Sequence, residues 1–193
     1  MKIGITGGIG SGKSIVCRVL KTMGYPVFDA DIAAKKIMLQ DIVVKSEVIA
    51  LLGEGAYIKG ELNRAYIAEK IFNNDVLREQ LNQIVHPAVR KSFQSWSDEQ
   101  EQDYTFMEAA ILFETGGDKN FDEVILVTAN EETRIQRVVK RDGASRNDIL
   151  KRMAKQMPES EKETKTNLVI YNEVDRLIIP QILSILKKLK YQY

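Results

Sequence analysis

The sequence has only one cysteine among its 193 residues. A single thiol, Cys17, excludes an internal disulfide and a cysteine-rich metal site, and it fits a reducing compartment. The sequence also lacks any run of about 18 apolar residues, so it predicts no membrane-spanning helix. Met1 and Lys2 lead directly into a short apolar run rather than into a secretory leader. Together these absences predict a cytoplasmic protein.

Neither sign of charge is in excess, because 28 basic and 27 acidic residues leave a net charge of +1. This balance gives no reason to expect binding to nucleic acid or to a membrane surface. Hydrophobic residues make up 44% of the chain and charged residues 28%, as is usual for soluble globular proteins. At this length we expect one α/β domain carrying a smaller subdomain, rather than two independent domains.

The most informative stretch runs from Gly7 to Ser14 (GGIGSGKS), fits G-x-x-x-x-G-K-[ST] and follows the apolar residues 3–6. Its glycines let the backbone approach a ligand, so that successive N–H groups bind one anion. In this pattern the lysine reaches the β- and γ-phosphates, the next serine offers its hydroxyl to Mg²⁺, and the following helix directs its positive end at the phosphates. The alternative is a glycine-rich turn that binds nothing. We interpret the stretch as a P-loop, with Lys13 also catalytic and Ser14 the metal ligand. ATP binding is predicted for Gly8, Gly10, Ser11, Gly12, Lys13, Ser14 and Ile15.

Five short apolar runs predict five buried strands, over residues 3–6, 26–29, 104–108, 124–128 and 167–171. Helical spacing of apolar residues predicts a helix that follows the P-loop and ends at Gly24, and a last helix over 173–190. The inward face of this last helix is expected to carry Leu177, Ile178, Ile182, Leu183, Ile185, Leu186 and Leu189. The predicted fold class is therefore α/β: a P-loop NTPase fold with a five-stranded parallel sheet flanked by helices.

Acidic residues follow two of these strands. Asp29 and Asp31 come after the second strand, and Glu108 ends the third in a Walker-B-like position. Ligands of parallel sheets lie beyond the carboxyl ends of the strands, so the two aspartates are expected to face the P-loop crevice. They could hold Mg²⁺ or accept the proton of an attacking hydroxyl. Alternatively, one of them only caps the next helix.

Residues 32–103 contain no clear buried strand and are predicted as helices over 32–39, 43–52, 64–73 and 75–96, with a turn at Gly53 to Gly60. A crossover between parallel strands needs only about a dozen residues, so this segment is interpreted as a helical insertion. The P-loop core would then comprise 1–31 and 104–193. Metabolite kinases bind the acceptor substrate in such insertions. Arg64 opens one of the helices, and His86 precedes Pro87 at an expected helix boundary, as a structural cap would.

Asn130 is predicted to cap a helix in which Arg134, Arg137 and Arg141 share one face. Asp142-Gly143-Ala144 ends this helix, and a capping-box pattern at Ser145 starts another. A basic helical hairpin after the fourth strand is typical of a lid that closes over ATP and brings arginine to the transferred group, here over about 134–157. The alternative is a solvated charged face.

These features together resemble the dephospho-coenzyme A kinases, which phosphorylate the ribose 3′-hydroxyl of dephospho-coenzyme A with ATP. The resemblance spans nearly the whole chain. It rests on residues 6–14, Asp29-Ala30-Asp31, Arg64 with Phe72, His86-Pro87, Leu112-Phe113-Glu114, Arg137, Arg141, Arg146 and Asn172. It implies that Asp31 lies near the acceptor hydroxyl and that the insertion binds the substrate. By resemblance, the substrate residues are Asp31, Arg64, His86, Glu114 and Arg146, the catalytic residues include Asp31, Arg137 and Arg141, and Arg141 and Asn172 contact ATP. A cytoplasmic role in coenzyme A synthesis comes with it.

The sequence departs from the family pattern at Ile15, at Ala110 and at the glycine expected after Asn172, so the loops 109–114 and 172–175 carry over least well. Two other functions start from the same P-loop. One is another P-loop metabolite kinase, such as a nucleoside monophosphate or shikimate-type kinase, which would lack the long insertion. The other is a regulatory GTP switch, whose D-x-x-G motif is absent and whose N-K-x-D motif has Glu173 in place of lysine.

Overall fold

The computed structural model describes residues 1–72 and 74–192. The chain forms two compact units, Met1–Phe28 with Glu101–Tyr193 and Asp29–Gln100, which are described separately. The sequence placed these limits after residues 31 and 103 instead of 28 and 100. Asn73, predicted as the last residue of a helix, lies outside the described residues.

The first unit is built on a five-stranded parallel sheet in the order β2-β5-β1-β6-β7. The strands are β1 (Lys2–Thr6), β2 (Val27–Asp29), β5 (Thr105–Glu108), β6 (Glu123–Thr128) and β7 (Leu168–Tyr171). The central strand β1 pairs in parallel with β5 on one side and β6 on the other, so that Ile3 lies opposite both Phe106 and Glu123. The five predicted strands and the predicted fold class are confirmed, and the P-loop leaves the carboxyl end of the central strand.

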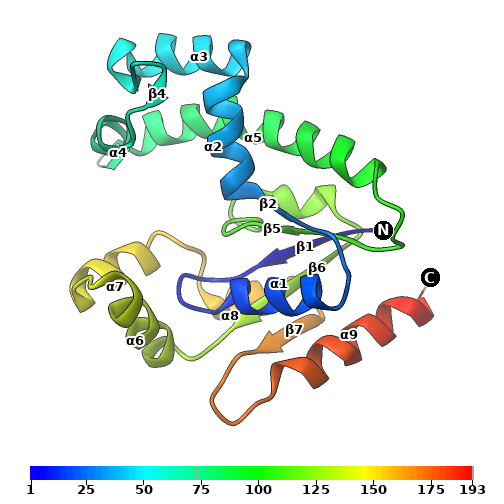
Figure 1. Ribbon diagram of the computed structural model, residues 1–193. Coiled ribbons are helices and arrows are strands. Elements are labelled where there is room, and N and C mark those ends of the chain that lie inside the picture. Colours follow the sequence, from blue (N-terminus) through cyan, green and yellow to red (C-terminus); the bar gives the residue numbers. More distant parts are fainter. Residues whose placement is uncertain (73, 193) are drawn as a thin grey trace. The chain divides into compact units, whose positions relative to one another are not determined.

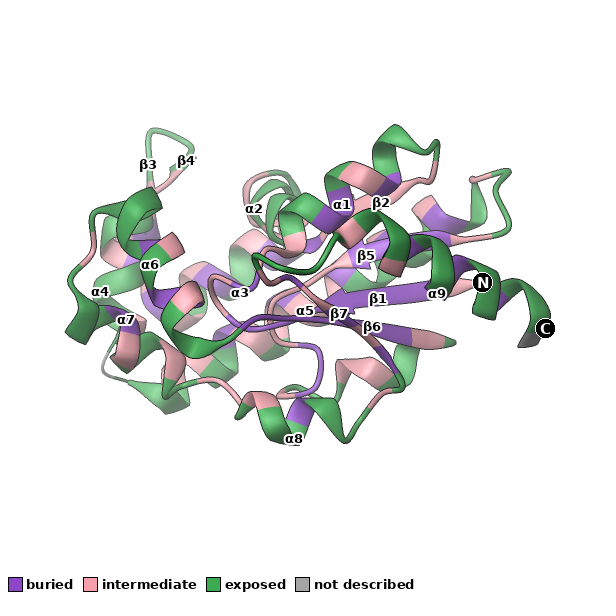
Figure 2. Cartoon of the chain, turned by 90° about the horizontal axis from the view of Figure 1, so that it is seen from below, coloured by how far each residue is buried: buried purple, intermediate pink, exposed green. Residues whose placement is uncertain are grey.

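One face of this sheet is covered by α1 (Lys13–Thr22) and α9 (Ile178–Gln192), which lie next to each other in Figure 1. Val16 and Leu20 of α1 pack against Ile5, Ile125 and Ile170 of the strands. Figure 2 shows how completely β1 and β6 are buried. Burial of this apolar layer fixes α1, and with it the P-loop that opens α1, to the sheet.

The opposite face of the sheet is covered by the segment after β5 and by the chain around α8 (Glu159–Glu163). Leu112 and Phe113 pack there against Val124 and Leu126 of β6, with Met157 beside them. Because side chains of a strand alternate between its faces, Thr128 shares this face with Leu126, and Tyr171 of β7 shares it with Val169. This face therefore lies on the other side of the sheet from α1.

Two further helices, α6 (Glu131–Asp142) and α7 (Arg146–Met153), form the hairpin that the sequence predicted. The side chain of Asn130 caps α6 by accepting a hydrogen bond from Thr133 N (2.8 Å), and Ser145 caps α7 in the same way. Gly143 ends α6 with a φ of 65°, which is a left-handed conformation suited to glycine. Ile135 and Val138 of α6 pack with Ile149 of α7 and with Ile9 of the P-loop. The hairpin is thus joined to the P-loop by a small core of its own.

The second unit contains α2 (Ala30–Gln40), α3 (Ile42–Leu52), α4 (Arg64–Phe72) and α5 (Asp75–Asp98), which match the four predicted helices. It also holds a hairpin that the sequence did not predict, β3 (Tyr57–Ile58) and β4 (Glu61–Leu62). Lys59 and Gly60 form its turn with φ values of 51° and 86°. Positive φ at both turn residues is the geometry that two-residue hairpins favour.

The helix boundary expected at His86-Pro87 is wrong, because α5 continues through Pro87. Its buried residues recur every four positions on both sides of the proline, at Leu81, Val85, Val89 and Phe93. A continuous apolar stripe of this length outweighs the loss of one backbone hydrogen bond at proline.

The last helix also differs from the prediction, since α9 begins at Ile178 rather than at residue 173. Leu177 precedes the helix and is 78% exposed, and Leu183 is 49% exposed, so neither packs inward as predicted. The residues that do pack are Ile178, Ile182, Ile185, Leu186 and Leu189, which follow the spacing of a single helix face. Across the described residues, no helix combines the length and the apolar content needed to cross a membrane.

Candidate active site

The backbone of the P-loop requires glycine, as two of its positions show most clearly. Gly10 and Gly12 have φ values of 79° and 93°. A Cβ atom on Gly12 would collide with the amide nitrogen of Asn172, and one on Gly10 with the backbone carbonyl of Arg134. The loop is therefore shaped by close contact with its neighbours as well as by its own dihedral angles.

Lys13 folds back over this loop. Its Nζ donates to the carbonyl oxygens of Gly7 (2.7 Å) and Gly8 (3.4 Å). The ammonium group is thereby held at the concavity of the loop by weak neutral acceptors, which a phosphate oxygen can replace with a stronger charge-assisted bond.

Two buried hydroxyl oxygens beside the loop, Ser11 Oγ and Thr6 Oγ1, have no hydrogen-bond partner among the described residues. Both side chains are 0% exposed. An unsatisfied buried hydroxyl costs about 1–3 kcal/mol, so two of them at one loop indicate a site kept open for a polar ligand.

Asn172 and Arg137 tie the P-loop to the end of β7. The Asn172 side chain donates to Ser11 O (2.8 Å), and Arg137 Nη2 donates to Asn172 O (2.9 Å). Arg137 Nη1 also lies 3.5 Å from the carbonyl oxygens of Gly10 and Ser11. The structure thus brings together Asn172 and Arg137, two of the predicted site residues. The side chains of both donate hydrogen bonds to backbone carbonyl oxygens.

Arg134, Arg137 and Arg141 do not form the single cationic face that their spacing predicted. Arg134 is buried, with 4% exposed, whereas the side chain of Arg141 is 64% exposed and forms a two-bond pair with Asp142 (2.7 and 3.0 Å). This pairing lowers the pKa of the Asp142 carboxyl below its ordinary value. The stripe is divided because the α6 backbone packs directly on the P-loop, which encloses only the first of the three side chains.

Arg146, predicted as a substrate residue, begins α7 and pairs with Glu132 (2.8 Å) on the protein surface. The hydrogen bonds from Arg146 lower the pKa of Glu132 below its ordinary value. Arg141 and Arg146 are thus exposed cations with exposed carboxylate partners, and such surface pairs contribute only about 0–1 kcal/mol. A phosphate can displace those partners at little cost.

Glu114, another predicted substrate residue, lies in a chain of four charges that we call the charge cluster: Arg134, Glu159, Lys162 and Glu114. Lys162 is 0% exposed, and its Nζ lies 3.1 Å from Glu114 Oε1 and 3.3 Å from Glu159 Oε1. Arg134 Nη1 lies 3.1 Å from the same Glu159 oxygen. Glu114 Oε2 is buried and has no hydrogen-bond partner among the described residues.

Sequence reasoning missed Glu159 and Lys162 altogether. They stand three residues apart in a strongly charged stretch, which is the usual pattern of an exposed helix surface. No local signal distinguishes them from their neighbours, because the other two members of the cluster come from distant parts of the chain.

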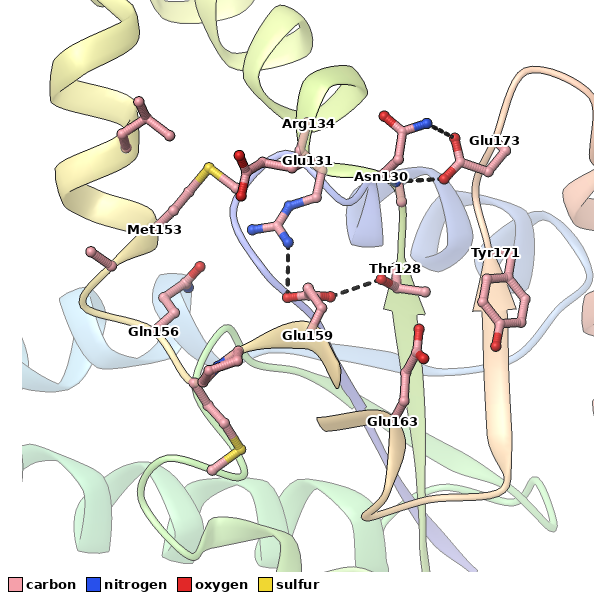
Figure 3. Close-up of a pocket in the computed structure, with 15 residues that line it drawn as sticks. Thr128, Asn130, Glu131, Arg134, Met153, Gln156, Glu159, Glu163, Tyr171 and Glu173 are labelled. Carbon is pink, nitrogen blue, oxygen red and sulfur yellow. Dashed lines mark hydrogen bonds and ion pairs between the residues drawn. The ribbon is translucent and has the colours of Figure 1, made fainter. Parts of the chain in front are cut away.

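A cavity of about 850 Å³ lies beside this cluster and is drawn in Figure 3. Glu159 is seen there between Arg134 and Thr128, whose hydroxyl donates to its second oxygen (2.8 Å). Thr128 and Tyr171 line the cavity from the face of the sheet opposite α1. The residues that line this cavity come from the carboxyl ends of β6 and β7, from α6 and from the segment that runs from α7 to α8, and none belongs to the P-loop.

No group of three or more His, Cys, Asp or Glu side chains in the described residues could hold a metal ion alone. Mg²⁺ is usually held by substrate phosphates with one or two protein ligands. Ser14 is exposed in the first turn of α1. Glu108 ends β5 opposite Ile5, and the pKa of the buried Cys17 thiol is raised by burial and by the charge of this carboxylate.

Asp29, Asp31, Arg64 and His86 belong to the second unit. Asp29 caps α2 by accepting from Ile32 N (2.9 Å), which is the structural alternative considered for one of the two aspartates. Asp31 is exposed in the first turn of α2, and Arg64 is exposed as the first residue of α4. His86 lies in the middle of α5, where burial and Arg90 lower its pKa below the ordinary 6.5.

Comparison with known proteins places these features in one family. The family profile described as dephospho-CoA kinase matches residues 1–176. The chain belongs to the dephospho-CoA kinase family. A dephospho-CoA kinase of Bacteroides fragilis strain YCH46 is 41% identical over 187 residues, which cover 96% of this chain and 91% of that protein. The corresponding protein of Porphyromonas gingivalis strain W83 is 40% identical over 189 residues, with 97% and 94% covered.

Solved structures share the fold of this chain. A crystal structure from Thermus thermophilus matches with a TM-score of 0.84 and 34% identity, covering 100% of this chain and 97% of that one. A dephospho-CoA kinase from Campylobacter jejuni matches with a TM-score of 0.70 and 23% identity over 98% of both chains. Shikimate kinase from Bacteroides thetaiotaomicron, at 12% identity and a TM-score of 0.54, shares the fold alone. The family membership confirms the predicted resemblance and disfavours the GTP switch.

Proposed function

We propose that this protein transfers the γ-phosphoryl group of ATP to the ribose 3′-hydroxyl of dephospho-coenzyme A, which gives coenzyme A and ADP. The observation that carries the proposal is the family match over residues 1–176, which includes an intact P-loop with a folded-back Lys13. In the reaction the hydroxyl oxygen forms a bond to the γ-phosphorus, the bond from that phosphorus to the β–γ bridging oxygen breaks, and the hydroxyl proton leaves to a base.

The donor side of this reaction is assigned to the first unit. Backbone N–H groups of the P-loop bind the phosphates, and Lys13 exchanges the carbonyl oxygens of Gly7 and Gly8 for phosphate oxygens. Ser14 would hold Mg²⁺, which when bound neutralises phosphate charge. Asn172 and Arg137 hold the loop against the end of β7, where the nucleotide is expected to extend. The orphaned Ser11 hydroxyl supports a polar ligand at this loop.

The acceptor side is assigned to residues 32–103 and to Asp31. Asp31 is the proposed general base, because it is exposed immediately beyond β2 while its neighbour Asp29 is occupied as a helix cap. Arg64 stands at the start of α4, where a cation opposes the helix dipole, so its position is better explained by a bound anion such as the pyrophosphate of the acceptor. His86 and the free oxygen of Glu114 are proposed to contact the acceptor as well.

The α6–α7 hairpin is the proposed lid. Arg141 and Arg146 are its proposed phosphate-binding residues, because both are exposed and can exchange a surface carboxylate for a phosphoryl oxygen at small cost. A lid that closes excludes water from the transferred group. A cytoplasmic location, where ATP and coenzyme A precursors are found, belongs to the same proposal.

The test offers purified protein, Mg²⁺ and labelled ATP to dephospho-coenzyme A, AMP, CMP, shikimate and pantetheine in parallel. Mass spectrometry then locates the new phosphate. We expect the ribose 3′-phosphate of coenzyme A as the dominant product. A higher kcat/KM for AMP than for dephospho-coenzyme A would reject the assignment in favour of a nucleoside monophosphate kinase.

A further inference from the structure

Ile9 lies in the middle of the P-loop, and side chains from outside the loop bind both its backbone N–H group and its carbonyl oxygen. Gln156 Oε1 accepts a hydrogen bond from Ile9 N (2.9 Å), and Arg134 Nε donates to Ile9 O (3.0 Å). The N–H group of Ile9 is thus engaged by the protein itself, unlike the N–H groups that a P-loop directs at phosphate.

Arg134 can hold this peptide because the charge cluster fixes its other end. While Nε bonds Ile9 O, Nη1 pairs with Glu159, and the whole side chain is only 5% exposed. Glu159 is itself shared with Lys162 and with the Thr128 hydroxyl. Two cations and two anions make the cluster neutral, as buried charges require.

The P-loop also contacts the charge cluster directly at Gly8. A Cβ atom there would come within 2.5 Å of both Arg134 Nη2 and Glu159 Oε1. Glycine at this position therefore lets Arg134 and Glu159 approach the loop backbone. Arg134, Gln156 and Glu159 all line the cavity, and Figure 3 shows Glu159 between Arg134 and Thr128.

We propose that Arg134 and Gln156 are positioning residues for phosphoryl transfer. Through their hydrogen bonds to the backbone of Ile9, they hold the P-loop in its phosphate-binding conformation. They act through the backbone of the loop rather than on the substrate. A displacement of about 1 Å in a reacting group costs on the order of 10²-fold in rate, so a loosened loop lowers turnover even when the protein stays folded. The inference rests on the proposed kinase function.

The first test replaces Arg134 by Lys. Arg134→Lys keeps the charge cluster neutral, but an ammonium group cannot reproduce the fork that joins Ile9 O to Glu159. We expect kcat/KM for ATP to fall about 10- to 100-fold. We also expect the Ile9 amide to exchange its hydrogen about 10-fold faster or more in NMR spectra of the nucleotide-free protein, as local opening does. Arg18→Lys, at an exposed position of α1, is the matched control and should change neither quantity.

The second test uses Gln156, whose substitution leaves the charge cluster intact. Gln156→Met removes the acceptor of Ile9 N at similar side-chain length, whereas Gln156→Glu keeps an acceptor oxygen. We expect Gln156→Met to speed Ile9 exchange and lower kcat/KM about 10-fold, and Gln156→Glu to restore most of both. A lowered melting temperature with unchanged kcat/KM in Arg134→Lys and Gln156→Met would overturn the proposal.

Lost activity with unchanged Ile9 exchange would also overturn the proposal, since the residues would then act without the loop. Ile9 exchange is measured without an acceptor. It therefore tests the positioning role even if dephospho-coenzyme A is not a substrate and the proposed function is wrong.

Discussion

Lys162 is the side chain whose removal is expected to destabilise the protein most clearly, because it is a fully buried cation that joins two carboxylates. Its Nζ lies 3.1 Å from Glu114 and 3.3 Å from Glu159. Lys162→Met fills most of the same volume and deletes only the charge. Removing one partner of a buried ion pair costs about 3–5 kcal/mol.

The lower end of that range applies here, because the two carboxylates keep some contact with water, with side chains 16% and 20% exposed. Glu159 also keeps Arg134 and the Thr128 hydroxyl. We therefore expect Lys162→Met to lower the free energy of unfolding by about 3 kcal/mol. For a chain of this size the melting temperature would fall by about 6–12 °C.

Urea unfolding followed by circular dichroism measures this loss, with Lys165→Met at an exposed position as the control. Adding Glu114→Gln to Lys162→Met removes one of the uncompensated charges, so the double variant should recover part of the stability. A loss below about 1 kcal/mol, or one equal to that of Lys165→Met, would refute the reasoning, since it would mean that water already compensates the carboxylates.

Four other predictions concern the site and the second unit. Lys13→Ala should keep the circular dichroism spectrum and lose nearly all phosphoryl transfer; loss of the fold as well would make Lys13 a structural residue. Asp31→Asn should lower kcat by about 10²-fold or more with ATP affinity within a few-fold, as a general base does, whereas weak ATP binding with high turnover would favour a metal or cap role. Arg141→Ala should lower kcat more than it weakens nucleotide binding, because a lid arginine acts on transition-state charge; a change in stability alone would support the solvated-face alternative. Burial and Arg90 hold the pKa of His86 below 6.5, so between the two pKa values the unfolded chain binds a proton that the folded chain does not. The free energy of unfolding should therefore be highest above pH 6.5 and should decrease as the pH falls below it. His86→Gln should flatten that fall in urea unfolding between about pH 7 and pH 5, and an unchanged slope would contradict the role of His86.

Local patterns in the sequence were sufficient for the P-loop and for the five strands, because short apolar runs and glycine spacing are set by neighbouring residues. They were also sufficient for the α6–α7 hairpin, whose Asn130 and Ser145 caps are local contacts. Pro87 shows where local rules fail. The proline signals a helix end, but packing of residues four apart on both sides of it keeps α5 continuous.

The charge cluster could not be predicted for a different reason. Its four residues lie at positions 114, 134, 159 and 162, and only the last two are near each other in the sequence. Glu159 and Lys162 look like an ordinary exposed pair until the fold brings Glu114 and Arg134 to them. Burial of a charge by distant parts of the chain leaves no local sequence pattern, so a buried lysine cannot be recognised from a single sequence.

The same contacts decide which part of α6 can act as a lid. Arg134 and Arg137 are fixed to the P-loop and to Asn172 by hydrogen bonds from charged donors, each worth about 1.5–3 kcal/mol. A lid that moved as a whole from residue 134 would have to break these bonds in every catalytic cycle. Arg141, one turn further along, bonds its neighbour Asp142 and no other residue in the part of the chain that the structure describes. The movement is therefore expected in the last turn of α6, near the left-handed Gly143, so that the first half of α6 stays with the P-loop while Arg141 turns toward the phosphates.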